Sequence, residues 1–166
     1  MKKNKDFNNH GFTLIEVVVS LVLVGIIGAV AGMGLVQLSK GFAFSKKTAA
    51  TAQKGQITIS MLVKEFSAIT SISSGTATSI TFTRDPGVTH TISWAGANNP
   101  LLIAADILTD SVNSFNLAYY NSYNDPSPST TYSPSTAMIE ITLELKGADD
   151  IPSEFANRVF MYKLIE

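Results

Sequence analysis

The first quarter of the chain is strongly apolar and contains one unexpected charge. Residues 17–36 carry no charged side chain, and about 20 such residues are enough for a helix to cross a bilayer. Glu16 stands directly before this run. A lone carboxylate costs roughly 2.5–3.5 kcal/mol or more at the centre of a bilayer. We therefore expect Glu16 to have a partner that belongs to the function.

The helical pattern continues beyond the apolar run. Apolar residues recur at three- and four-residue spacing, which is typical of a helix with one buried face, at Ile59, Leu62, Phe66 and Ile69. No proline occurs before Pro86. The pattern predicts one helix from near Phe12 to near Ile69, roughly 85 Å long at 1.5 Å per residue, with Gly41 and Gly55 as weak points.

Strand patterns fill the rest of the chain. Residues 71–78 are predicted to be a linker and residues 121–136 a loop, because they are rich in Ser, Thr, Gly or Pro. Alternating or short apolar runs predict strands near residues 80–82, 92–94, 101–103, 112–120, 139–145 and 159–165. The turn sequence Asp85-Pro86-Gly87 predicts a hairpin between the first two. The fold class is α+β, a long N-terminal hydrophobic helix packed on an antiparallel β-sheet domain.

Composition excludes several kinds of chemistry. The chain has no cysteine, so disulfides, thiolate metal sites and cysteine nucleophiles are excluded. Its formal net charge of −1 gives no reason to expect nucleic-acid binding. His90 is expected to be an ordinary strand residue, and the Asp149-Asp150 and Asp106…Asp110 clusters to be solvated loops. We expect no catalytic residue, cofactor or metal.

The head of the apolar run carries a recognisable motif. Gly11-Phe12-Thr13-Leu14-Ile15-Glu16 resembles the cleavage and methylation motif of type IV pilins and of the pseudopilins of type II secretion. The resemblance implies that a prepilin peptidase cuts between Gly11 and Phe12 and that Phe12 is N-methylated. It also implies that Glu16 helps to dock the subunit into a filament.

Three looser patterns sharpen the resemblance. The segments 108–120, 157–160 and 61–66 are similar to those of J-type minor pseudopilins and related minor pilins. The resemblance implies a minor pseudopilin of a type II secretion system, which is not an enzyme and assembles into a short pseudopilus or its tip complex. The implied partners are the prepilin peptidase, other pilins or pseudopilins and the inner-membrane assembly platform.

The expected organisation follows from these patterns. Residues 1–11 form a leader peptide, 12–38 the transmembrane and assembly half of the helix, 39–72 its amphipathic half, and 73–166 a β-rich periplasmic domain. The protein is expected to be a single-pass inner-membrane protein before it assembles. Lysines flank the span on both sides, so the orientation rests on the resemblance and not on the charge rule.

Other interpretations of the same sequence stay open. The first segment has the features of a secretory signal peptide, although its apolar run exceeds the usual 7–15 residues, or of a plain uncleaved anchor. The chain is alternatively a minor type IV pilin that serves pilus biogenesis, adhesion, motility or DNA uptake. A membrane-tethered enzyme or binding domain is the third alternative.

Overall fold

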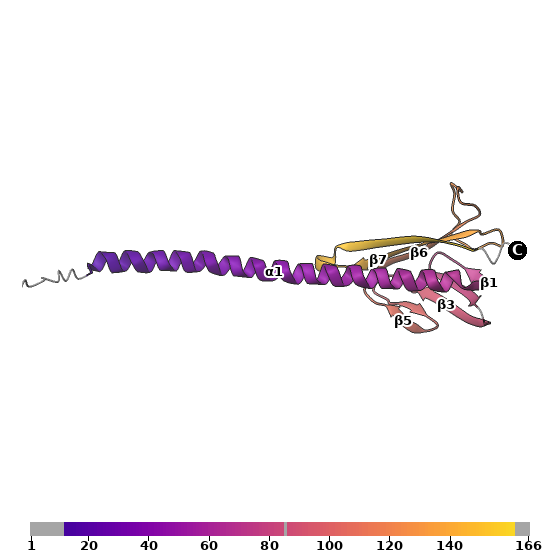
Figure 1. The fold of residues 1–166 in the computed structure, drawn as a ribbon, viewed down its shortest axis with the longest axis horizontal. Coiled ribbons are helices and arrows are strands. Elements are labelled where there is room, and N and C mark those ends of the chain that lie inside the picture. The colour runs from indigo at the N-terminus through magenta and orange to yellow at the C-terminus, as the bar shows by residue number, and fades with distance from the viewer. Residues whose placement is uncertain (1–11, 85, 162–166) are drawn as a thin grey trace, which may run out of the picture. The chain divides into compact units, whose positions relative to one another are not determined.

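A computed structural model describes residues 12–84 and 86–161 and shows an α+β protein. One 54-residue helix, α1, spans Leu14–Ser67 (Figure 1). The strands follow it in the order β1 (Ile69–Gly75), β2 (Ser79–Arg84), β3 (Val88–Trp94), β4 (Leu101–Ile103), β5 (Asp106–Thr109), β6 (Val112–Tyr120), β7 (Met138–Lys146) and β8 (Pro152–Phe160). A short 3₁₀ helix, η1 (Ala148–Asp150), lies between β7 and β8.

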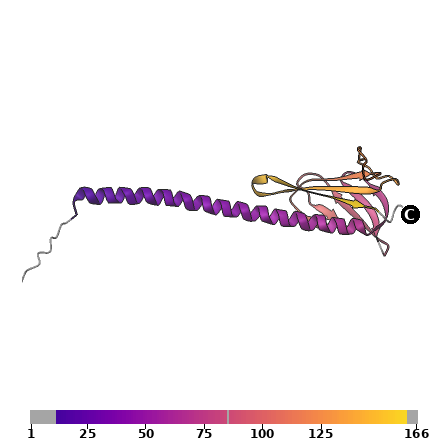
Figure 2. The same ribbon diagram turned by 45° about the horizontal axis from the view of Figure 1, so that its top comes forward.

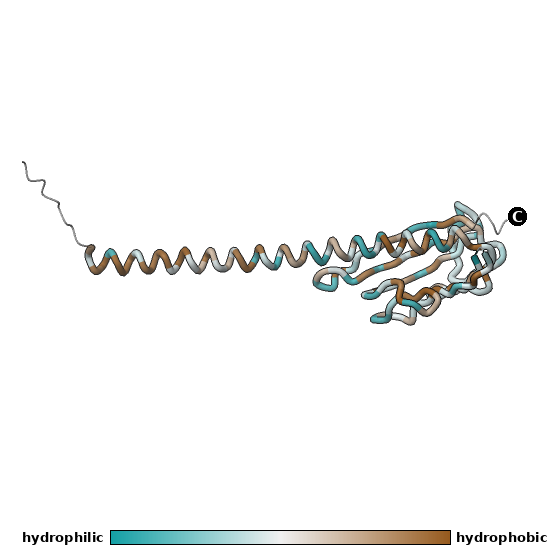
Figure 3. Tube along the Cα trace, turned by 60° about the horizontal axis from the view of Figure 1, so that its bottom comes forward, coloured by the Kyte–Doolittle hydropathy of each residue, from teal (hydrophilic) through white to brown (hydrophobic). Residues whose placement is uncertain are grey.

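The chain forms two units, residues 1–43 and 44–166, and α1 runs through the boundary. In the first unit, every described side chain is exposed, and the helix is predominantly apolar along its length (Figure 3). In the second unit, burial of α1 begins at Thr51 and continues at intervals to Phe66. The same helix therefore has one part whose described side chains are all exposed and one part that packs within a folded core.

The second unit contains two antiparallel sheets instead of the single sheet expected (Figure 2). Strands β1 to β5 form one sheet in sequence order, and β6, β7 and β8 form the other. Two backbone hydrogen bonds link segments of the two sheets: Leu117 N–H of β6 donates to the Ala77 carbonyl in the β1–β2 turn at 2.7 Å, and Tyr132 N–H of the β6–β7 loop donates to the Gly75 carbonyl of β1 at 3.1 Å.

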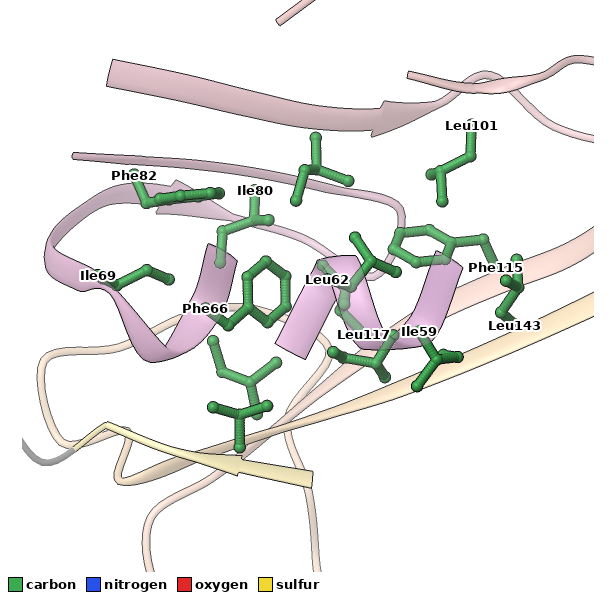
Figure 4. Close-up of a cluster of buried hydrophobic side chains, with 14 of the residues drawn as sticks. Ile59, Leu62, Phe66, Ile69, Ile80, Phe82, Leu101, Phe115, Leu117 and Leu143 are labelled. Atoms are coloured by element: carbon green, nitrogen blue, oxygen red, sulfur yellow. The ribbon is translucent and has the colours of Figure 1, made fainter. Parts of the chain in front are cut away.

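The core lies where α1 meets both sheets, and Figure 4 shows its side chains converging on the helix. The four apolar positions predicted to form a buried stripe are all 6% exposed or less. Ile59, Leu62 and Phe66 confirm the predicted buried face of the helix, whereas Ile69 is buried as the first residue of β1. Burying one such side chain contributes about 1.5–3 kcal/mol. The stripe meets the sheets through Ile80, Phe82, Ile92, Leu101, Phe115, Leu117 and Leu143.

The helix ends earlier than the sequence predicted. It stops at Ser67, and Ile69 pairs with Arg84 as the first residue of β1. The predicted linker at 71–78 is therefore wrong in its first half. The segment from Ile69 to Ile72 contains three β-branched residues and one serine. β-Branched residues disfavour helix, and Ser and Thr side chains also compete for backbone hydrogen bonds. The spacing of the apolar residues fits either a helix or a strand at this point.

The hairpins show one success and one error. Strands β2 and β3 pair as predicted, with Ile80 opposite Ile92, although Asp85 of the predicted turn lies outside the described residues. The last strand was expected at 159–165, but β8 begins at Pro152 and pairs with β7 over nine residues; residues 162–166 lie outside the described part. Strand β8 is mostly solvent-exposed, so its polar composition concealed it.

Candidate processing and assembly site

The N-terminal end of α1 is built by Thr13. Its carbonyl accepts hydrogen bonds from the N–H groups of Glu16 at 3.1 Å and Val17 at 3.3 Å. Its side-chain Oγ1 accepts a further bond from the Glu16 N–H at 3.3 Å. A threonine at the cap position with a glutamate three residues later has the spacing of a capping box. The motif therefore also contains the local signal that starts the helix.

The backbone of Glu16 takes part in the cap, but its side-chain carboxylate does not. Its side chain is exposed, and its carboxylate makes no hydrogen bond or ion pair with residues 12–84 or 86–161. It lies in the first turn of α1, where the partial positive charge of the helix end favours an anion. The arrangement leaves both carboxylate oxygens available to a cation from another molecule.

Phe12 lies two residues before the first residue of α1 and is 79% exposed. Gly11, the other residue of the expected cleavage site, lies outside the described residues. The structure thus places Phe12 and Glu16 at the same end of α1.

Within the described residues, α1 is the one helix long and apolar enough to cross a membrane. None of its most apolar 18-residue window is buried against the rest of the chain. Four glycines in this region, Gly25, Gly28, Gly32 and Gly34, have no atom within 4 Å of an added Cβ. The surface is therefore apolar, open and smooth at these positions.

His90, expected to be an ordinary strand residue, belongs to a charged cluster that joins the helix to the first sheet. Arg84 Nη1 donates to Glu65 Oε1 at 2.6 Å, and His90 Nδ1 lies 3.3 Å from Glu65 Oε2. These side chains connect α1 with β2 and β3, and the His90 ring also faces Phe82 at 6.1 Å. The cluster is consistent with a role in holding the helix on the sheet.

The two acidic clusters differ in the contacts that their carboxylates make. Asp110 forms an ion pair with Lys54 of α1, and the hydrogen bond from Lys54 holds the pKa of that carboxyl below its usual value. Asp149 and Asp150 are exposed in η1. Among the residues that the structure describes, no three acidic, histidine or cysteine side chains gather as a metal site would require.

Comparison with known proteins found one match. The family model for the prokaryotic N-terminal methylation motif matches residues 6–32, which include Gly11, Phe12 and Glu16. No curated protein and no solved structure matched the chain. The matched motif, the long N-terminal helix and the antiparallel sheets together support a type IV pilin-like protein.

Proposed function

We propose that this chain is a pilin-like structural subunit, and specifically a minor pseudopilin of a type II secretion system. The observation that carries the subunit role is an open apolar helix with a carboxylate at its head that pairs with no described residue. The methylation motif over residues 6–32 supports processing by a prepilin peptidase. The narrower assignment to type II secretion rests on the similarity of segments 61–66, 108–120 and 157–160 to J-type minor pseudopilins.

The mechanism begins with hydrolysis of the Gly11–Phe12 peptide bond. Cleavage leaves a cationic amine on Phe12, which subsequent methylation keeps basic. Phe12 lies only four residues before Glu16, so each subunit carries one cation and one anion at the same helix end. The Glu16 carboxylate of one subunit then pairs with the Phe12 amine of a neighbour.

Desolvation drives this pairing. In an apolar environment an unpaired carboxylate costs several kcal/mol, and an opposite charge at close range offsets that cost. The pairing penalises any axial register in which Glu16 misses its partner. Glu16 would therefore select the register of the helices as well as promote their association.

The remaining assignments follow from this role. Residues 1–11 serve as the leader and 12–38 as the membrane and assembly segment. The helix then continues to Ser67 and packs in the folded unit from Thr51 onward, and the strands from Ile69 form the β-rich domain outside the cytoplasm. The subunit waits as a single-pass inner-membrane protein. Its partners are the prepilin peptidase, other pilins or pseudopilins and the assembly platform.

The capping geometry makes a sharp test possible. Glu16→Gln keeps a residue that suits a capping box but removes the charge, whereas Thr13→Ala removes the cap and keeps the carboxylate. We expect Glu16→Gln and Glu16→Leu to insert and be cleaved but to assemble poorly. Thr13→Ala should assemble better than either, because α1 has 54 residues and one cap contributes only about 1 kcal/mol.

The measurement is the amount of sheared filament relative to membrane-bound subunit, with cleavage followed as a gel shift. Substitution of Gly11 should abolish the shift, which provides the processing control. Wild-type assembly by Glu16→Gln would contradict the charge-pairing mechanism. Equal loss in Glu16→Gln and Thr13→Ala would assign Glu16 to helix capping alone.

Deletion of the gene in its native host decides between the two filament systems. Loss of secreted proteins with intact surface pili supports the type II secretion role. Loss of pili, twitching or transformation with normal secretion would assign the chain to the minor type IV pilins and leave the Phe12–Glu16 mechanism unchanged.

A further inference from the structure

The outer face of α1 in the second unit carries an apolar groove that no strand covers. It has a volume of about 350 Å³ and is lined by Gln56, Ile57, Ser60, Met61 and Lys64. Ile57 is 53% exposed and Met61 49% exposed. Lys64 is exposed, and none of the residues that the structure describes forms an ion pair with it. The groove thus combines an apolar floor with a free cation.

A surface of opposite character lies in the loop between β7 and β8. Ile151 is 56% exposed and follows Asp149 and Asp150, whose carboxylates make no hydrogen bond or ion pair within the described ranges. The loop is held in shape because Ile151 N–H donates to the Ala148 carbonyl at 3.0 Å and its own carbonyl accepts from Gly147 N–H at 2.9 Å. It presents one apolar side chain beside two free anions.

We propose that this acidic loop, residues 147–151 of one copy, docks into the Ile57–Met61 groove of a second copy. Ile151 covers the apolar floor, and the carboxylates of Asp149 and Asp150 face Lys64. The proposal rests on the subunit role proposed above, because it names a contact through which such subunits associate. The exposed Ile107 also has acidic residues near it in the sequence, Asp106 and Asp110, but there one of the two carboxylates, that of Asp110, is already paired with Lys54.

The loop and the groove lie at different positions along α1. Asp150 and Lys47 line the same cavity, so the loop lies beside α1 near residue 47. Ile57 and Met61 of the groove lie ten and fourteen residues later, so at 1.5 Å per residue the separation along the helix is roughly 15–20 Å. A second copy in parallel orientation must therefore be displaced along the helix by about that distance.

This displacement determines the kind of assembly. The two contacting surfaces differ, so the interface is heterologous. After two copies bind, the copy that supplied its loop still has a free groove, and the copy that supplied its groove still has a free loop. Such contacts produce an open filament unless a rotation closes them into a ring. The docking therefore supports the same axial growth as the helix pairing, through a separate part of the chain.

The natural chain has no cysteine, which makes cross-linking specific. Cells that carry a prepilin peptidase and an assembly platform would co-express two full-length chains, one with Met61→Cys and one with Ile151→Cys. We expect a disulfide-linked dimer on oxidation when both are present and little when either is alone. The matched control replaces Ile151→Cys by Ile107→Cys, which alters an isoleucine that is 69% exposed in the same unit.

Charge reversal tests the pairing itself. Lys64→Glu should reduce the cross-link yield about fivefold, which corresponds to about 1 kcal/mol for an exposed ion pair. Asp149→Lys with Asp150→Lys on the other chain should restore it. Equal dimer yields from the Ile151 and Ile107 variants, or no restoration by charge exchange, would overturn the docking.

Failure of the proposed function gives a different result. If the wild-type chain is neither cleaved nor assembled, the subunit role fails and the docking fails with it. If the wild type assembles and Glu16→Gln does not, but Met61→Cys and Ile151→Cys give no specific dimer, the docking alone is wrong.

Discussion

Replacing Gly55 by alanine has two opposing effects on stability: alanine favours the helix, and its Cβ overlaps a neighbouring side chain. The Phe155 ring of β8 lies against Gly55, and an added Cβ would overlap three carbons of that ring. Overpacking of this kind costs about 1–3 kcal/mol, whereas alanine is about 1 kcal/mol better than glycine inside a helix. We therefore expect Gly55→Ala to destabilise the second unit by about 0–2 kcal/mol.

A double-mutant cycle separates the two effects. In a Phe155→Ala background the overlap disappears, so Gly55→Ala should then stabilise by up to about 1 kcal/mol. The coupling between the substitutions should equal the steric cost of about 1–3 kcal/mol. Gly41→Ala is the matched control, because nothing lies within 4 Å of its added Cβ, and it should be neutral or stabilising.

Urea titration of the full chain in detergent provides the assay. Trp94, the single tryptophan, belongs to β3 and reports on unfolding of the second unit. With a slope of about 2 kcal/mol per molar urea, a change of 1–2 kcal/mol moves the midpoint by roughly 0.5–1 M. A Gly55→Ala variant that is more stable than the wild type while Phe155 is present would refute the reasoning.

Two further predictions concern pH. Burial raises the pKa of Tyr119, so its contribution to stability is complete below about pH 10, the ordinary value, and is lost as the pH rises further. Tyr119→Phe should remove this alkaline loss while costing about 1 kcal/mol at neutral pH, because the 3.0 Å bond to the Thr76 carbonyl disappears; an unchanged alkaline profile in thermal unfolding would exclude Tyr119 as the cause. Hydrogen bonds from Asn113 at 2.9 Å and Ser114 at 2.8 Å lower the pKa of Glu144, so its contribution is present above about pH 4.3 and is lost as the pH falls through the lowered value. Asn113→Ala with Ser114→Ala should flatten the dependence of the urea midpoint between about pH 5 and 3, and a slope equal to that of the wild type would contradict this.

The elements that the sequence predicted well are those in which apolar and polar residues alternate strongly. Residues 139, 141, 143 and 145 are apolar, and all four are buried in β7, so alternation located that strand. Strand β8 has its partner on one side and is largely exposed, and its side chains carry little of the apolar signal. Its place depends on pairing with β7, which composition alone does not contain.

The candidate site was predictable to different degrees. Glu16 and Phe12 could be identified from a short motif. The spacing of Thr13 and Glu16 within it is also the sequence signal for a helix cap. Gly55 was interpreted as a weak point of the helix, whereas in the structure the Phe155 ring of β8 packs against it. The outer groove was missed, although Ile57 and Met61 are four residues apart and lie off the buried stripe.

The buried stripe of α1 also determines how the folded unit responds to mechanical load. Its buried residues lie at intervals from Thr51 to Phe66 along one continuous helix. Tension applied along α1 therefore reaches the sheets as shear, and the interlocked side chains resist it together instead of parting one after another. The Phe155 ring beside Gly55 adds an obstacle to sliding in this direction. A pull or push along the helix is therefore borne by the whole stripe and does not begin by peeling the helix from the domain.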